Sequence, residues 1–247
     1  MPAGSDELIR MVEVCGALAS YAYLKGSHDP IPAVRHIKSI SCGHVSFSIY
    51  QSSGWTVIAI TGTDERADWG YSCEREFVPS ENGIRVHAGF LKFAEVISMA
   101  LRSEQQNLKC EDCRLLITGH SLGGAAATIL PLVSDLNPHS VITFGAPKCM
   151  HGEDTHMYAH RVINVRNLDD IIPWIPLAKV NRPWGSPGEV YYLTGSAVSS
   201  FPGSPLRRFA KQAYSAATYF MRRGKFLGIY DHGMPRYLKN ISGVRNR

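Results

Sequence analysis

The sequence has no cysteine pattern typical of a small disulfide-bonded protein or of a zinc site. Its 247 residues contain six cysteines without compact framework spacing, so no set of disulfides is implied. Cys110 and Cys113 form a single C-x-x-C pair. Because no second pair is present to complete a zinc site, we expect both to be free thiols.

The sequence also lacks a strong charge imbalance. Its formal net charge is +5, far from the basic excess of a nucleic-acid-binding protein, so no nucleic-acid partner is expected. Charged residues make up 19% of the chain and hydrophobic residues 45%. This composition is that of a globular protein and not of a disordered one.

Neither a signal peptide nor a membrane span is evident. The first residues carry acids where a signal peptide carries bases. The longest apolar stretch, residues 115–133, is about as long as a membrane span, but it contains His120, Ser121, Pro131 and three glycines. We therefore expect a protein without membrane-spanning helices, located in the cytoplasm.

What the sequence does contain is one serine in a specific setting. Residues 114–118 are a short apolar run that predicts a buried strand, and the small residues after Ser121 predict a closely packed helix. Between them lies a G-x-S-x-G pentapeptide, Gly119-His120-Ser121-Leu122-Gly123. In this context the pattern describes a nucleophile elbow, a sharp strand-to-helix turn that presents the serine hydroxyl. The backbone N–H of Leu122, at the helix start, is the predicted first donor to an oxyanion.

A bare G-x-S-x-G pentapeptide can also arise by chance in a chain with 22 glycines. The preceding strand, the following helix and the extra glycine at position 124 favour the functional interpretation. That interpretation requires an acid and then a histidine further along the chain, in this order.

Predicted strands and helices alternate along the rest of the chain. This alternation predicts a mostly parallel central sheet flanked by helices, in a single α/β domain spanning residues 1–247. Strands are expected at residues 44–51, 55–60, 140–144, 159–165 and 189–193, helices at 6–24, 89–107 and 206–225, and a loop at 26–43. In such a sheet, catalytic groups lie at the carboxyl ends of the strands.

Two acids and one histidine meet these requirements. Asp169 and Asp170 follow the strand expected at 159–165, where a buried carboxylate can fix the tautomer of a histidine, although either acid can instead cap the turn before Pro173. His232 follows the last predicted strand–helix pair. Three other histidines share a polar segment with two acids, and a solvated loop is favoured there over a metal site: His151, His156 and His160.

Several segments, in their order along the chain, resemble the class 3 lipases, the α/β-hydrolases typified by fungal triacylglycerol lipases. They are the turn at 61–69, the run Val86-His87-Ala88-Gly89-Phe90 and the elbow, and the resemblance covers residues 44–240 at the level of motifs. It implies an α/β-hydrolase fold with a short lid, a second oxyanion donor at Thr63 and a catalytic histidine at His232. The family pattern D-x-[VI]-P-x-x-P matches residues 170–176 and favours Asp170 over Asp169. One departure is Thr61, which stands where the family usually has arginine.

Two regions provide candidate contacts to a substrate or a lipid surface. Trp69 lies in the segment matching the lid, and Trp174 and Ile175 are either walls of an acyl pocket or ordinary core residues. The helix expected at 206–225 carries basic residues and no acid. A solvated face is its default interpretation, and the alternative is contact with an anionic lipid surface through Arg207, Arg208, Arg222 and Arg223.

Together these residues predict a serine carboxylic-ester hydrolase acting on acylglycerol or other lipid esters. Ser121 is the expected nucleophile, His232 the base and Asp170 its partner, while Leu122 and Thr63 hold the oxyanion. This chemistry requires no metal and no organic cofactor. The alternatives are a phospholipase A1 or thioesterase, and a non-catalytic binding module of the hydrolase fold, which the presence of every expected catalytic group disfavours.

The composition of the lid segment generates a first testable prediction. Four of the five residues at 64–68 are charged, which leaves mainly Trp69 and Tyr71 as apolar cover. Charges cost free energy when they move from water to hydrocarbon, so we expect weak activation by an oil surface and good turnover of short, soluble esters. The measurement is hydrolysis rate against ester concentration across the solubility limit. A steep rise at the emulsion boundary contradicts this expectation.

Overall fold

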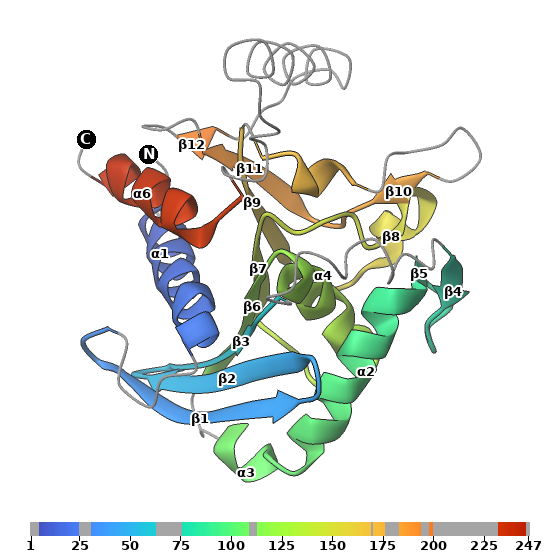
Figure 1. Cartoon of the computed structure of the whole chain (residues 1–247), viewed down its shortest axis with the longest axis horizontal. Coiled ribbons are helices and arrows are strands. Elements are labelled where there is room, and N and C mark those ends of the chain that lie inside the picture. Colours follow the sequence, from blue (N-terminus) through green and yellow to red (C-terminus); the bar gives the residue numbers. More distant parts are fainter. Residues whose placement is uncertain are drawn as a thin grey trace.

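The central element of the fold is an eight-stranded sheet (Figure 1). The structure, a computed structural model, describes residues 5–24, 31–62, 76–108, 113–168, 170–175, 183–193, 198–199 and 232–245. The strand order is β1 (Val34–Cys42), β2 (Val45–Ser52), β3 (Trp55–Ile60), β6 (Arg114–His120), β7 (Ser140–Phe144), β9 (Val162–Asn167), β11 (Glu189–Leu193) and β12 (Val198–Ser199). Pairing is parallel from β3 to β11 and antiparallel at both edges. The predicted α/β architecture with a mostly parallel sheet is confirmed.

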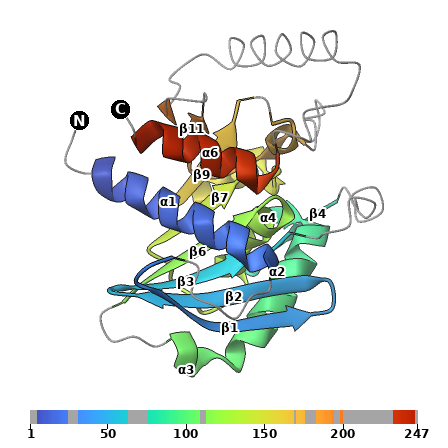
Figure 2. The ribbon, with the colours of Figure 1, turned by 60° about the vertical axis from the view of Figure 1, so that its left-hand side comes forward.

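Helices cover both faces of this sheet (Figure 2). On one face, α1 (Ser5–Tyr21), which continues into the short η1 (Ala22–Leu24), packs beside α6 (Met234–Arg245). On the other face, α2 (Ala88–Arg102) packs beside α4 (Leu122–Ile129), and α3 (Gln105–Leu108) follows α2. None of the helices within the described ranges is long and apolar enough to cross a membrane.

The alternation of side chains along β3 supplies both faces of the core. Val57 and Ala59 pack with α1 and α6, whereas Ile58 and Ile60 pack with α2 and α4. Successive strand residues point to opposite faces, and all four side chains are fully buried. A strand buried on both faces has a continuous apolar sequence, which explains why residues 55–60 predict a strand so clearly.

The expectation of a loop over residues 26–43 is wrong for its second half, which forms β1. This strand lies at the edge of the sheet next to β2 and has an irregular register between His36 and Lys38. Most of its residues are exposed or half-buried. An edge strand needs only a weak apolar face, so its sequence carries little of the alternation that identifies a half-buried strand.

A second, four-stranded sheet carries the polar segment with three histidines. It consists of β10 (Trp184–Gly185), β8 (Met150–His151), β5 (Arg85–His87) and β4 (Phe77–Pro79). Trp184 is buried there against the rings of Phe77 and His87. His151 accepts a hydrogen bond from the N–H of Glu153. No cluster of metal-ligating side chains occurs in the described part of the chain.

One acid of this segment ties the second sheet together. Asp154, in η3 (Gly152–Met157), accepts hydrogen bonds from the Arg85 backbone N–H at 2.8 Å, from its Nε at 2.8 Å and from its Nη2 at 2.7 Å. The Asp154 side chain is nearly buried. These bonds hold β5 against the loop after β8, a role that the spacing of the histidines does not predict.

The expectation that Cys113 is a free thiol is wrong, because Cys113 is disulfide-bonded. Cys15, Cys42 and Cys149 are free thiols, and burial raises the pKa of Cys15 and of Cys149 to about 12. Cys110 lies outside the described residues. Sequence spacing does not determine which cysteine Cα atoms the fold brings within bonding range.

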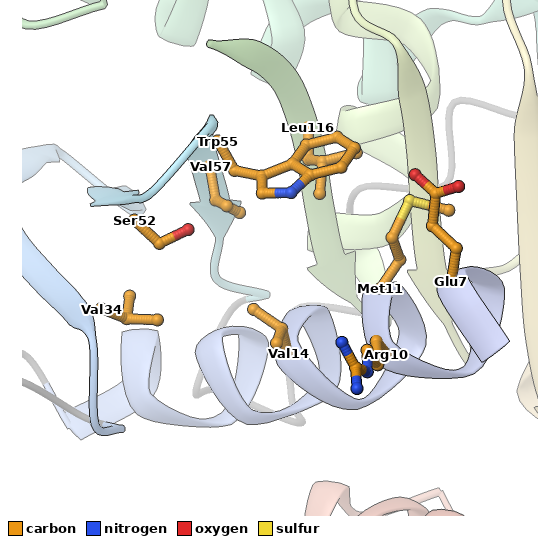
Figure 3. A pocket seen from close by; sticks show the side chains of 9 residues that line it. All are labelled: Glu7, Arg10, Met11, Val14, Val34, Ser52, Trp55, Val57 and Leu116. Atoms are coloured by element: carbon orange, nitrogen blue, oxygen red, sulfur yellow. The ribbon is translucent and has the colours of Figure 1, made fainter.

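A cavity of about 500 Å³ lies between α1 and the sheet (Figure 3). Its walls include Met11 and Val14 from α1 and Trp55 and Leu116 from β3 and β6. Trp55 and Leu116 stand near the amino ends of their strands, whereas Ser121 follows the carboxyl end of β6. The cavity is therefore at the opposite end of the sheet from the predicted nucleophile.

The Arg85–Asp154 contact predicts a stability that depends on pH. Its hydrogen bonds lower the pKa of Asp154 from 3.8 to about 2, so the native state holds a carboxylate at pH values where the unfolded chain binds a proton. This stabilisation is complete above about pH 4 and is lost as the pH falls towards about 2. Asp154→Asn should lower the melting temperature by roughly 5 °C at pH 7 and by much less at pH 2.

Thermal unfolding followed by circular dichroism at pH 7, 4 and 2 measures this difference. Asp135→Asn is the matched control, because Asp135 is exposed, follows α4 and belongs to no strand of the second sheet. Equal melting temperatures for Asp154→Asn and Asp135→Asn at pH 7 would contradict the prediction.

Candidate active site

Ser121 stands at a strained turn between β6 and α4. Its backbone has φ 58° and ψ −129°, a left-handed conformation that non-glycine residues rarely adopt. A Cβ added at Gly119 would collide with the backbone of Gly123, and one at Gly123 would collide with the backbone of β3 at Ile60. Strand and helix pass so closely that only glycine fits at both positions, as the predicted nucleophile elbow requires.

The elbow places the backbone N–H of Leu122 at the start of a helix, directly after Ser121. Leu122 is the first residue of α4, where N–H groups have no partner within the helix. The carbonyl of Ser121 already accepts the N–H groups of Gly124 at 2.9 Å and Ala125 at 3.2 Å. The Leu122 N–H and the helix dipole therefore favour negative charge next to Ser121.

The predicted acid and histidine form a buried pair. Asp170 Oδ2 accepts a hydrogen bond from His232 Nδ1 at 2.8 Å, and the two residues are 1% and 9% exposed. With its proton on Nδ1, a neutral His232 carries the basic lone pair on Nε2. Asp169 lies outside the described residues.

Two more donors hold the Asp170 carboxylate. Tyr237 Oη donates to Oδ2 at 2.6 Å, and the backbone N–H of Ile172, at the start of η4 (Ile172–Trp174), donates to Oδ1 at 2.9 Å. Burial, together with the negative charge of Asp170, raises the pKa of Tyr237, so its hydroxyl keeps the proton that it donates. Tyr237 also accepts the N–H of Asn167 at 3.1 Å. The carboxylate thus has partners from η4 and from α6, which a buried charge requires.

The structure links Ser121 to this pair through the end of β7. The N–H of Ser121 donates to the carbonyl of Phe144 at 2.9 Å. The next residue, Gly145, has φ +60°, and an added Cβ would lie 2.8 Å from Asp170 Oδ2 and 2.9 Å from His232 Nδ1. Gly145 therefore leaves the space that the acid–histidine pair occupies, a role that the sequence analysis did not assign. The feature of the sequence that indicates this role is a glycine directly after the buried strand predicted at 140–144.

The turn after β3 is anchored without the arginine that the family usually has. Thr61 donates to the carbonyl of Ser46 twice, from its N–H at 2.9 Å and from Oγ1 at 2.7 Å. Gly62 lies directly against the elbow, since an added Cβ there would be 3.5 Å from Ser121 Cβ. Thr63, the predicted second oxyanion donor, and Trp69 lie outside the described residues.

Three further residues named in the sequence analysis lie within the described part of the chain: His87, Trp174 and Ile175. His87 accepts the N–H of Gly89 at 3.1 Å and stacks on Phe90, so it caps α2. Trp174 is half-buried in η4, with the guanidinium of Arg166 5.7 Å from its ring centroid. The carbonyl of Ile175 accepts the N–H of Lys148 at 2.9 Å. Trp174 and Ile175 thus follow Asp170 closely, and their contact with substrate stays a prediction.

Comparison with known proteins identifies the family of this chain. The sequence pattern of "Lipase (class 3)" matches residues 57–180, which is half of the chain. The chain belongs to the class 3 lipase family. Class 3 lipases are carboxylic-ester hydrolases, and the matched region contains the elbow and the predicted acid.

The chain resembles solved structures over more of its length than it resembles a curated relative. It is 27% identical over 120 residues to LIH1, a lipase candidate of Saccharomyces cerevisiae, a match that covers 39% of this chain and 37% of the relative. It superposes on the Rhizomucor miehei triacylglyceride lipase with a TM-score of 0.65 at 18% identity, covering 92% of this chain and 94% of the other. It superposes on Lip2 lipase from Yarrowia lipolytica with a TM-score of 0.62 at 19% identity, and the match covers 78% of this chain and 81% of the other. The fold is therefore that of the α/β-hydrolases.

The position of Gly145 gives a prediction for this lipase. Gly145→Ala should reduce ester hydrolysis by about 100-fold or more, because the new methyl group displaces Asp170 and His232 from productive geometry. Gly43→Ala is the matched control: Gly43 has a similar φ of +63°, but an added Cβ meets nothing within 4 Å. Both variants bear the same backbone strain, so a similar loss of turnover in the two would show that strain and not displacement is responsible. The measurement is kcat on a soluble ester.

Proposed function

We propose that this lipase is a serine hydrolase that cleaves lipid esters through an acyl-enzyme. The observation that carries the proposal is the buried hydrogen bond between Asp170 and His232 beside the strained Ser121 turn. The order of these residues in the chain, serine, then acid, then histidine, is that of α/β-hydrolases.

In the proposed mechanism, His232 Nε2 takes the proton from the Ser121 hydroxyl while the serine oxygen bonds to the ester carbonyl carbon. The carbonyl oxygen becomes an oxyanion, which the N–H of Leu122 and the predicted donor Thr63 stabilise. The imidazolium of His232, stabilised by Asp170, then gives its proton to the departing alcohol. A water molecule deprotonated by His232 cleaves the acyl-enzyme and restores Ser121. These steps use only groups of the protein and water, so the proposal includes no metal and no organic cofactor.

The substrate class is the next part of the proposal. Acylglycerols are supported by similarity to the Rhizomucor miehei triacylglyceride lipase and to a triacylglycerol lipase from Penicillium expansum. Phospholipase A1 and thioesterase activities use the same serine chemistry and are the alternatives for substrate. A non-catalytic binding module is disfavoured, because a binding role does not require a histidine whose proton is fixed on Nδ1 by a buried acid.

Contact with a lipid surface is proposed from sequence alone. The four arginines of the expected basic helix lie outside the described residues: Arg207, Arg208, Arg222 and Arg223. A single domain over residues 1–247 is likewise proposed from length and element order. Neither proposal enters the chemistry at Ser121.

Ser121→Ala tests the proposed function. The variant should fold and lose about 10⁶-fold in kcat, the loss seen when the nucleophile of a serine hydrolase of another fold is removed. The wild-type protein should be labelled by a fluorophosphonate ester and the variant should not. Mass spectrometry of the labelled protein should place the adduct on Ser121.

Ser134→Ala is the matched control, because Ser134 is half-buried beyond the carboxyl end of α4 and its hydroxyl donates to the carbonyl of Leu130. It should retain labelling and turnover. Residual turnover above a few per cent in Ser121→Ala, measured on p-nitrophenyl esters and on triacylglycerols, would mean that Ser121 is not the nucleophile.

A further inference from the structure

A partly buried chain of hydrogen bonds lies beside the proposed site and is not used by the mechanism. Tyr23, on η1, lies 3.0 Å from the N–H of Gly62 and 3.0 Å from His120 Nδ1. On its other side His120 Nε2 lies 2.6 Å from the backbone carbonyl of His232. The chain therefore joins the turn after β3, the residue before Ser121 and the backbone of the proposed base.

The chemistry of these atoms determines the position of every proton. The His232 carbonyl can only accept, so His120 Nε2 carries a hydrogen and donates it. A neutral imidazole then has a bare Nδ1, which accepts the hydroxyl hydrogen of Tyr23. The Tyr23 oxygen in turn accepts the N–H of Gly62. All bonds run in one direction, from Gly62 to Tyr23, to His120 and to His232.

His120 remains neutral in this position. Burial and the nearby His232 lower the pKa of His120 to about 3. The two imidazole rings have their centroids 4.5 Å apart at an interplanar angle of 34°. When His232 becomes an imidazolium during turnover, the adjacent positive charge disfavours a proton on His120 still further. The tautomer that donates to the His232 carbonyl is thus preserved throughout the proposed reaction.

We propose that Tyr23 and His120 are a pair of positioning residues that align the turn at Gly62 with the backbone of His232. The inference rests on the proposed function, in which His232 is the base and the turn after β3 borders the oxyanion. Asp170 orients the His232 side chain from one side, and His120 holds the His232 backbone from the other. Tyr23 extends this alignment to Gly62, which lies against Ser121 Cβ.

Tyr23→Phe tests the pair, because it removes only the hydroxyl that joins Gly62 to His120. We expect kcat per titrated active site to fall about 10- to 100-fold with KM changed less than twofold, since small misplacements of catalytic groups cost rate and not substrate binding. Active sites are counted by fluorophosphonate titration. A loss due only to partial unfolding lowers the titrated fraction and leaves kcat per titrated site unchanged.

The matched control is Tyr158→Phe. Tyr158 is buried, whereas Tyr23 is half-buried, and the Tyr158 hydroxyl donates to the carbonyl of Thr128 on α4, so this substitution also removes a tyrosine hydrogen bond. Its kcat per titrated site should equal that of the wild type. Equal values of kcat per titrated site for wild type, Tyr158→Phe and Tyr23→Phe would overturn the proposal.

Nitrogen-15 NMR of the wild-type imidazoles keeps the proposal falsifiable if Tyr23→Phe does not fold. His120 should show a protonated Nε2 and a bare, hydrogen-bonded Nδ1 between pH 8 and pH 5. The opposite tautomer, or protonation of His120 in this range, would overturn the proposal. Failure of the proposed function has a different signature, because the wild-type protein would then resist fluorophosphonate labelling even with His120 in the expected tautomer.

Discussion

The close approach of three backbone segments is the constraint on which the site depends. β6 must turn into α4 within one residue while both lie against β3, and this contact excludes side chains at Gly119 and Gly123. Ser121 takes the strained conformation at the centre of the contact. The small residues of α4, which are fully or almost fully buried, allow the helix to lie close to the sheet. The long apolar stretch at residues 115–133 is thus explained by this packing and not by a membrane span.

A buried carboxylate imposes a second requirement on the fold. Asp170 at 1% exposure needs donors, and it obtains them from His232, Tyr237 and the N–H of Ile172. Two of these come from the segment that contains α6, so the packing of α6 beside α1 and the acid–histidine pair support each other. The electrostatics of the site and the packing of the core therefore stabilise the same arrangement.

Sequence reasoning predicted the parts of the molecule in which local pattern and burial agree. The central strands are apolar on both faces, and the elbow needs glycine at fixed positions, so both are visible in the residues themselves. The pairing of Asp170 with His232 was predicted from order in the chain and from family resemblance, and the hydrogen bond between them is present. Their catalytic roles, like those of Ser121, Leu122 and Thr63, remain proposals.

Contacts between distant segments were not predictable in the same way. β1 has the weak pattern of an edge strand, and the disulfide of Cys113 depends on spatial proximity that spacing does not encode. The contact of Arg85 with Asp154 spans 69 residues, and that of Tyr23 with His120 spans 97. A tyrosine in an N-terminal helix and a histidine inside an elbow carry no local sign that they meet. Gly145 is a similar case. Residues distant in the chain, Asp170 and His232, leave no space for a side chain at this position.

The separation of acid and base along the chain has a consequence for synthesis. Asp170 and His232 are 62 residues apart, and the strands β7, β9 and β11 lie between Ser121 and His232 in the order of translation. A nascent chain that has formed the sheet as far as β11 holds Ser121 and Asp170 but lacks His232, the proposed base. Of the three donors to Asp170, only the N–H of Ile172 is then available. The buried acid–histidine pair is therefore completed only after the segment that contains α6 has been synthesised.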